Sequence, residues 1–291
     1  VNDIRDIAPL ATLNNLVKLD LNSNIIEHIN PIACLSKLSE LNLTSNQISD
    51  FSALSGLKEL KILNLRHNYT IDIVALGGLK RLTELSVDIN DLANEDILVI
   101  SKLKNLIKLE LYIYGNADIT PLAQLKKLRS LNIGTEGNSS FRWIINLKYL
   151  SELYLHNLVF NDIATIAELQ KLTKLELTSH EIKDITPLGV LKKMSELRLS
   201  NMNITDITPL AKLKNLKKLD LNFNDISNIA PLAELRQLTE IGLCSNCIDN
   251  GCDSKLRGKA IVLLTEQVCD EVELLTLVGG PEQNHPVASP L

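Results

Sequence analysis

Aromatic residues are scarce in this chain, as are several features that mark common protein classes. Phe, Tyr and Trp make up 3% of the 291 residues, so aliphatic side chains must fill the core. No apolar run approaches the roughly 20 residues that a membrane-spanning helix needs. The net charge of −5 disfavours a protein that binds nucleic acid, because phosphate binders accumulate Lys and Arg. We therefore expect neither membrane insertion nor a nucleic-acid partner.

Cysteine is also sparse, and its number is odd, so at least one thiol stays free or pairs between chains. A zinc site built from Cys244-x-x-Cys247 with Cys252 and Cys269 lacks the second Cys-x-x-Cys pair of a typical ribbon. If the protein is exported, a disulfide between Cys252 and Cys269 is the better interpretation. We predict no metal and no cofactor. The remaining cysteine, Cys34, lies far from these four in the sequence.

What the sequence has in abundance is one repeated pattern of leucines. Leu13, Leu16, Leu19 and Leu21 set a frame that occurs eleven times, at intervals of 22 residues except for one interval of 24. We number these coils 1 to 11, from Leu13 to Leu235, and a partial repeat precedes them. Such a period predicts a solenoid of stacked coils.

Each coil is predicted to have two different sides. The alternation around Leu19 is typical of a half-buried strand, and the strands of successive coils should form a parallel concave sheet. About five residues remain for the convex side, which fits a short 3₁₀ or single-turn helix. Thr before Pro, as in Thr208-Pro209, is expected to cap it. The fold class is thus an α/β solenoid, a curved leucine-rich-repeat array.

Two polar registers run through the repeats. Asn24 and its equivalents 46, 68, 90, 224 and 246 sit where the backbone leaves the sheet, and their amides can satisfy neighbouring coils. Aspartates at another register, such as Asp206, precede an Ile in a turn. They are interpreted as acceptors of local backbone N–H groups rather than as catalytic carboxylates. The ladder Asn is lost in five successive coils, through drift or through adaptation to a ligand.

The segment from Asp206 to Leu232 closely resembles the 22-residue repeat of the bacterial internalin family. Over roughly residues 1–250 the chain consists of repeats that resemble it in the same way. The resemblance implies a surface or secreted protein that binds host receptors through its concave face, with a role in adhesion or virulence. We assign residues 1–250 to the solenoid, 251–278 to a C-terminal cap and 279–291 to a disordered tail. Because the chain starts inside a repeat, we expect a further segment upstream.

The outward strand positions change character in coils 5 to 7. Tyr112 and Tyr154 are expected roughly 10 Å apart with a gap above Gly134, since neighbouring strands lie about 4.8 Å apart. Exposed Tyr and His amid charge are typical of an interface hot spot, although scattered surface aromatics need no functional explanation. The predicted partner-binding residues are Tyr112, Tyr114, Tyr154, His156, Arg66, Asp88 and Glu110.

Two further patterns lie outside that site. Phe141 and Phe160 fall on core registers, whereas Trp143 does not and is a candidate for a second, convex contact. A basic residue follows the first leucine in eight coils, which predicts a positive flank. The ordinary interpretation is that these basic residues are simply solvated. The functional interpretation is that they contact an acidic partner or an anionic surface. The residues are Lys58, Lys80, Lys104, Lys126, Lys148, Lys192, Lys214 and Arg236.

No nucleophile motif or phosphate-binding loop is found, so we predict a monomeric protein-binding module rather than an enzyme. The favoured partner is a protein, such as a host surface receptor, met outside the cell or on a bacterial surface. The alternative is an intracellular scaffold that regulates an enzyme such as a protein phosphatase. The thiol state separates the two, since an intact disulfide favours export.

Overall fold

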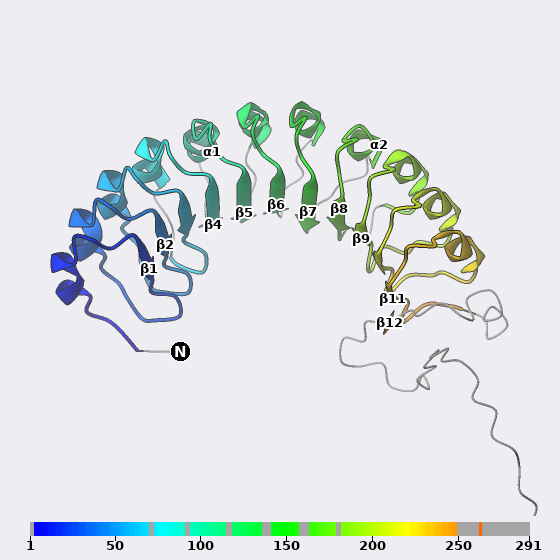
Figure 1. The fold of residues 1–291 in the computed structure, drawn as a ribbon, viewed down its shortest axis with the longest axis horizontal. Coiled ribbons are helices and arrows are strands. Elements are labelled where there is room, and N and C mark those ends of the chain that lie inside the picture. The colour runs from blue at the N-terminus through cyan, green and yellow to red at the C-terminus, as the bar shows by residue number, and fades with distance from the viewer. Residues whose placement is uncertain are drawn as a thin grey trace, which may run out of the picture.

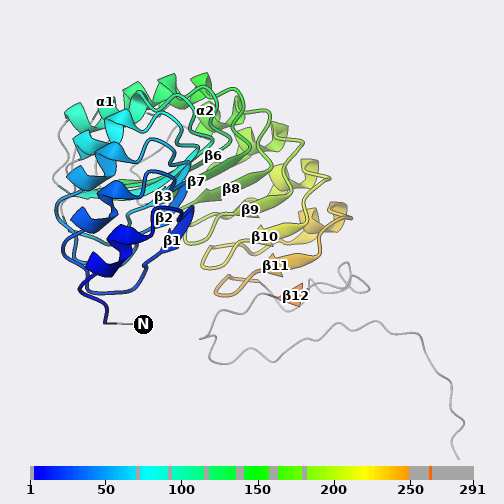
Figure 2. The same cartoon turned by 60° about the vertical axis from the view of Figure 1, so that its left-hand side comes forward.

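The computed structural model describes residues 3–69, 73–90, 94–114, 118–135, 141–156, 163–178, 182–248 and 262–263. The chain forms an arc with strands along its inner side and helices along its outer side (Figure 1). The strands form one parallel sheet in which each pairs with the next in sequence order. This confirms the predicted leucine-rich-repeat solenoid. Figure 2 shows the strands following one another along the arc.

The strands of the sheet are β1 Lys18–Asp20, β2 Glu40–Asn42, β3 Ile62–Asn64, β4 Glu84–Asn90, β5 Lys108–Tyr114, β6 Ser130–Thr135, β7 Glu152–His156, β8 Lys174–Leu177, β9 Glu196–Arg198, β10 Lys218–Asp220, β11 Glu240–Gly242 and β12 Val262–Leu263.

The convex side is built from short helices, as the repeat length predicts. The 24-residue interval accommodates the longest of them, α1. The helices are η1 Ala8–Thr12, η2 Asn30–Cys34, η3 Ser52–Gly56, η4 Ile73–Gly78, α1 Asn94–Ser101, η5 Thr120–Gln124, η6 Arg142–Asn146, α2 Ile163–Ala167, η7 Thr186–Val190, η8 Thr208–Lys212 and η9 Ala230–Glu234.

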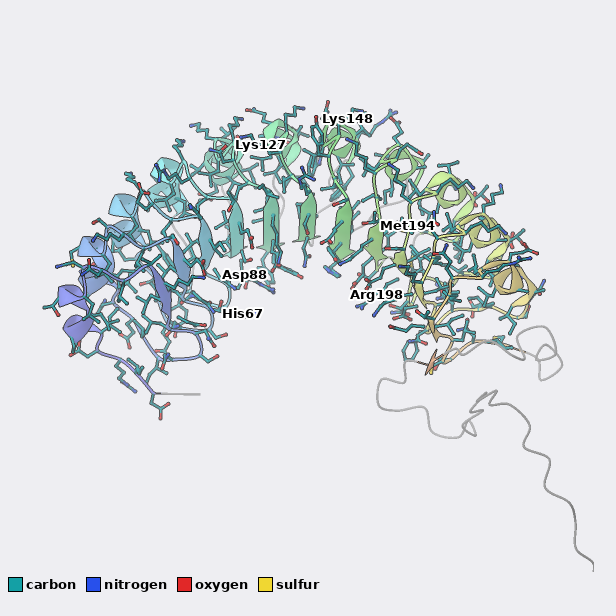
Figure 3. The ribbon with its side chains drawn as sticks, in the orientation of Figure 1. His67, Asp88, Lys127, Lys148, Met194 and Arg198 are labelled. Carbon is teal, nitrogen blue, oxygen red and sulfur yellow. The ribbon has the colours of Figure 1, made fainter. Side chains whose placement is uncertain are left out.

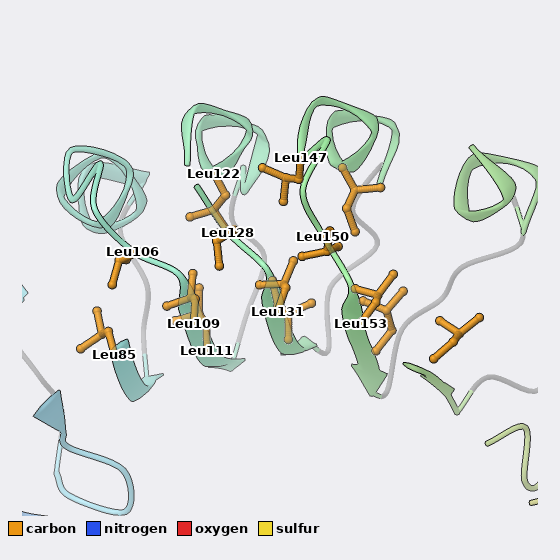
Figure 4. Packing of buried hydrophobic residues seen from close by; sticks show 14 of the residues in the cluster. Leu85, Leu106, Leu109, Leu111, Leu122, Leu128, Leu131, Leu147, Leu150 and Leu153 are labelled. Carbon is orange, nitrogen blue, oxygen red and sulfur yellow. The ribbon is translucent and has the colours of Figure 1, made fainter. Parts of the chain in front are cut away.

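The core is a set of leucine rows that run along the arc. Leu85, Leu109, Leu131 and Leu153 pair in register through β4 to β7 and are fully buried (Figure 4). Each buried leucine contributes roughly 1.5–3 kcal/mol relative to an exposed one. Because every coil repeats these positions, register is fixed by the rows themselves, and the outward side chains of adjacent strands are also brought into line.

Buried asparagines lie a few residues after the strands of the outer coils. Asn46 donates to Leu21 O at 2.9 Å and Leu43 O at 3.1 Å, and its Oδ1 accepts from Ile26 N at 3.1 Å. The residue before it, Ser45, has a left-handed φ of 56° that turns the chain out of the sheet. Asn24 and Asn224 are buried in the same way. The predicted asparagine ladder is therefore present in these coils, while the side chain of Asn90 lies outside the described residues.

The expected cap at the helix start is wrong in one respect. Ile207, which precedes η8, makes no side-chain cap, and Thr208 is already the first helical residue. The Asp206 carboxylate accepts instead from Thr208 N at 2.8 Å. Hydrogen bonds from the hydroxyl and then the backbone N–H of Thr208 lower the pKa of Asp206. The aspartate register is thus the capping element, in agreement with its predicted local role.

Trp143 was expected on the convex surface, but it is buried, with 6% of its surface exposed. It occupies the register of Pro121 in the preceding coil and lies against Phe141, with ring centroids 6.0 Å apart. Its Nε1 has no partner among the described residues. Phe141 is buried as predicted, and Phe160 lies outside the described residues. So do the predicted cap and tail, except for β12, which pairs with β11.

Candidate functional site

The middle of the concave face has the longest strands. Strands β4 to β7 contain five to seven residues, whereas β1 to β3 and β9 to β11 contain three. The extra length adds a third outward position to the sheet itself. Parallel pairing then aligns the side chains of this position into one row across the four strands, running from Asp88 through Tyr112 and Gly134 to His156.

Arg66 joins the start of this row to its centre. Its Nε donates to Asp88 Oδ1 at 3.0 Å, and its guanidinium lies 4.4 Å from the centroid of the Tyr112 ring. A second nitrogen approaches Glu110 Oε2 at 3.7 Å. Arginine over an aromatic face is favourable because of the ring quadrupole, and its planar group can meet carboxylates at the same time. We call Arg66, Asp88, Glu110, Tyr112 and His156 the Tyr112 cluster.

Gly134 allows the Tyr112 ring to lie down across the sheet. A Cβ at position 134 would lie 2.7 Å from Tyr112 Cδ1, closer than real side chains come. Across this glycine Tyr112 stacks on His156, with centroids 6.1 Å apart and an interplanar angle of 10°. The Tyr112 hydroxyl and Asn132 Oδ1 are 3.3 Å apart. The expected gap above Gly134 is therefore filled by Tyr112, and His156 rather than Tyr154 is the neighbour of Tyr112.

Tyr154 and Tyr114 lie beside the cluster. Tyr154 occupies the adjacent row, in register with Asn132 and Glu176. Burial, followed by the nearby carboxylates of Glu152, Glu196 and Glu176, raises the pKa of Tyr154 to about 12. Its hydroxyl thus stays protonated at physiological pH. Tyr114, at the end of β5, is 48% exposed and is a free surface aromatic.

The electrostatics of His156 favour the neutral imidazole. Burial is the main cause of its lowered pKa, and the positive charge of Arg66 acts in the same direction, against the opposing carboxylate of Glu176. The contact between His156 Nδ1 and Glu176 Oε1 measures 3.9 Å, too long for a hydrogen bond. His156 therefore serves mainly as a flat ring that supports Tyr112.

Most charges elsewhere on the concave face are also paired with each other. Lys18 contacts Glu40 at 2.7 Å, and Lys218 contacts Glu240 at 2.8 Å. Such exposed pairs stabilise by at most about 1 kcal/mol. They do, however, leave the face nearly neutral locally, so the aromatic row is its main departure from the repeated pattern.

Sequence reasoning found the aromatic residues and the position of Gly134 but missed two residues beside them. His67 donates its backbone N–H to Asp88 Oδ2 at 2.9 Å, and its ring also approaches that oxygen. Glu176, whose carboxylate lies 3.9 Å from His156 Nδ1, is the other. The available signal was positional, because residues 22 or 24 apart in this frame share a row. Applied to the adjacent row, that rule places Glu176 beside Tyr154.

Of the described cysteines, Cys34 and Cys247 are free thiols. Cys252 and Cys269, the predicted disulfide pair, lie outside the described residues. Over the described ranges, no group of three His, Cys, Asp or Glu side chains gathers as a metal ion requires. No helix in the same ranges is both long and apolar enough to cross a bilayer.

Family models of leucine-rich repeats match two parts of the chain. Residues 14–69 match the model described as leucine rich repeat, and residues 192–234 match the model described as leucine rich repeats in two copies. A comparison with curated proteins finds no match. Leucine-rich-repeat proteins are typically binding modules rather than enzymes, and the family matches therefore agree with the absence of a recognised catalytic motif.

Solved structures with this fold include an internalin, InlF of Listeria monocytogenes. It is 29% identical, with a TM-score of 0.72 over 88% of this chain and 75% of that one. A leucine-rich-repeat protein of Leptospira interrogans shares the fold at 24% identity, with a TM-score of 0.68 over 88% of this chain and 74% of that one. The plant peptide hormone receptor RGFR1, solved in complex with RGF2, matches at 20% identity and a TM-score of 0.58. That match covers 89% of this chain and 49% of the receptor.

Proposed function

We propose that this chain, a leucine-rich-repeat protein that resembles the internalins, binds a protein partner on the middle of its concave sheet. The observation that carries the proposal is the Tyr112 cluster on the longest strands. Tyr and Arg dominate the binding energy of many interfaces. Here the rings are already held in place, so a partner would lose little additional side-chain entropy in covering them.

The geometry divides the predicted binding residues into two roles. Arg66 contacts Asp88, Glu110 and the Tyr112 ring, so these charges hold the arginine over the ring rather than wait for a partner's charges. Tyr112, Tyr154 and the more exposed Tyr114 supply the surface that a partner would cover. His67 is 58% exposed in its side chain and borders this surface (Figure 3).

The resemblance to InlF supports an exported or surface-bound bacterial protein that acts in adhesion or virulence. In this role the partner is the extracellular domain of a host surface receptor, bound by a monomer. An intracellular scaffold that regulates an enzyme is the alternative. Counting free thiols in the native protein separates them, because a Cys252–Cys269 disulfide is expected only after export.

The binding proposal can be tested with paired tyrosine variants. After a receptor domain is found by screening host extracellular domains, its affinity for Tyr112→Ala/Tyr154→Ala should fall at least about tenfold, or 1.4 kcal/mol. Tyr69→Ala/Tyr149→Ala removes two other exposed tyrosines and should bind normally. Thermal melting establishes that both variants are folded. Unchanged affinity of the first variant would sink the proposal.

A further inference from the structure

Charge is strongly segregated around each coil. In the six residues that lead from the convex helix towards the strand, such as 124–129, Lys and Arg far outnumber Asp and Glu. Across all eleven coils these segments hold 18 of the 30 basic residues of the chain but only 3 of its 35 acidic ones. All 18 are exposed. We call this surface the basic flank. Its basic residues are Lys37, Lys58, Lys61, Lys80, Arg81, Lys102, Lys104, Lys126, Lys127, Arg129, Lys148, Lys171, Lys192, Lys193, Lys212, Lys214, Lys217 and Arg236.

The basic flank is not neutralised by its own molecule. Within the described residues, only Arg81 and Lys214 of these 18 form an ion pair, with Glu59 and Glu234. The other ten ion pairs of the described residues all join side chains of the concave face or its edge. Sixteen basic residues of the basic flank therefore have no acidic partner among the described residues, although the chain as a whole has a net negative charge.

The spacing of the solenoid places these cations in a line. Lys80, Lys104 and Lys126 follow the first leucine of successive coils, and the pKa of Lys104 is lowered by burial and then by the positive charges of Lys126 and Lys80. Lys127 Nζ donates to Asn105 Oδ1 at 2.7 Å, which holds its stem along the flank. Figure 3 shows Lys127 and Lys148 beside the convex helices, far from Asp88 on the inner side.

We infer that the basic flank binds a linear, densely sulfated polysaccharide. A polymer of closely spaced anions can follow the line from coil to coil and release its counterions at each one. Fifteen of the 18 basic residues are lysines, whose compact ammonium groups attract sulfates without the planar geometry that arginine imposes. Tyr149, 53% exposed, lies in the same flank with Lys171 Nζ 4.2 Å from its ring centroid. The exposed part of this ring can pack against a sugar.

The width of the basic flank favours a slim ligand. At the first strand residue beyond it the charge is mixed, because glutamates of the concave face occupy that position in coils 2, 4, 7, 9 and 11 and lysines occupy it in coils 1, 5, 8 and 10. A single polysaccharide chain can lie on the cations without covering these carboxylates. A nucleic-acid duplex or an anionic membrane is broader and would meet them. The boundary residues are Glu40, Glu84, Glu152, Glu196 and Glu240.

The experiment compares two triple variants that remove the same charge. K80S/K104S/K126S interrupts the line, whereas R5S/R142S/K183S removes three exposed basic residues that lie outside it and form no ion pair within the described residues. Binding of a heparin-derived oligosaccharide is measured by calorimetry at several salt concentrations. We expect the flank variant to lose roughly tenfold or more in affinity and to show a shallower salt dependence, and the control to stay within about twofold. Thermal melting verifies that both variants fold.

Other arms distinguish the source of the anion and the two binding faces. Desulfated oligosaccharide, duplex DNA and vesicles containing phosphatidylserine should each bind more weakly than the sulfated probe. Tyr112→Ala/Tyr154→Ala should bind the probe normally, so failure of the concave-face proposal leaves this result unaffected. Equal losses in both triple variants, absence of binding by the unaltered protein, or tighter binding of DNA or vesicles would overturn the inference.

Discussion

The outer coils and the middle coils share one repeat but end their strands differently. In coils such as 2 and 10 a buried asparagine ties two adjacent coils together, and a left-handed residue before it turns the chain away after three strand residues. In coils 5 to 7 that asparagine is replaced and the strands continue. Tyr112 and His156 occupy the additional strand length. Loss of the asparagine is not the whole cause, because β4 keeps Asn90 and has seven residues, whereas coil 9 has Met202 at that register and a three-residue strand.

The largest expected effect comes from removing an outer-coil asparagine. Asn224 is 4% exposed, donates to Leu199 O and Leu221 O, and accepts from Ile204 N. Asn224→Ala leaves these buried groups unpaired and should lower the free energy of unfolding by about 3 kcal/mol. Tyr114→Ala, at the same register in coil 5, should cost less than about 1 kcal/mol because Tyr114 is 48% exposed. Urea titration measures both, and equal losses would remove the distinction between the two regions.

A smaller loss is expected when the Tyr112 cluster loses its arginine. Asp88 is 9% exposed, so Arg66→Ala leaves a nearly buried carboxylate without its main cation. We expect a loss of about 2 kcal/mol. Arg198→Ala removes a 47% exposed arginine that also contacts two glutamates and should cost less than about 1 kcal/mol. If chemical denaturation ranks the two variants the other way, the cluster does not position Tyr112 as described.

Gly134→Val tests the stack without removing either ring. The new Cβ would displace Tyr112, and partner affinity should fall about tenfold, equivalent to 1.4 kcal/mol. Gly242→Val introduces a similar collision with Asn222 in the outer coils and should leave partner affinity unchanged. The chemical shifts of the His156 ring protons report whether the stack is lost. Wild-type affinity in a variant with a displaced Tyr112 would show that ring position is unimportant.

The smallest effect concerns pH. Burial lowers the pKa of His156 below its ordinary value of 6.5, so the unfolded chain takes up this proton before the folded one. Its contribution to stability is therefore complete above pH 6.5 and is lost as the pH falls through the folded pKa. Between pH 7 and pH 5, His156→Gln should lose less stability than the wild type.

The leucine period alone predicted the architecture, because one coil contacts only its neighbours and the same positions recur. It also predicted that the aspartates accept local backbone N–H groups, although it assigned the cap to Thr208, and it drew attention to Tyr112 and His156 because they depart from an otherwise polar outward row. These conclusions need only local sequence spacing. The packing of one side chain on another across coils follows different rules.

Side-chain direction could not be obtained from the repeat. Gly134 was interpreted as a gap because a glycine presents no side chain, but that vacancy is what lets Tyr112 turn towards His156. Trp143 was placed outside because it does not fall on a core register of the repeat. Its large ring instead packs inward against Phe141, where burial of apolar surface outweighs the unpaired Nε1.

The parallel sheet determines how the molecule responds to stretching along the arc. Its backbone hydrogen bonds run along the arc from each strand to the next, for instance from Leu21 N to Asn42 O and from Leu43 N to Asn64 O. Tension between β1 and β11 would therefore pull these bonds lengthwise and load the coils in series. Such a chain yields one link at a time. An optical trap should thus record a succession of small extensions, each close to the contour length of a single 22-residue coil.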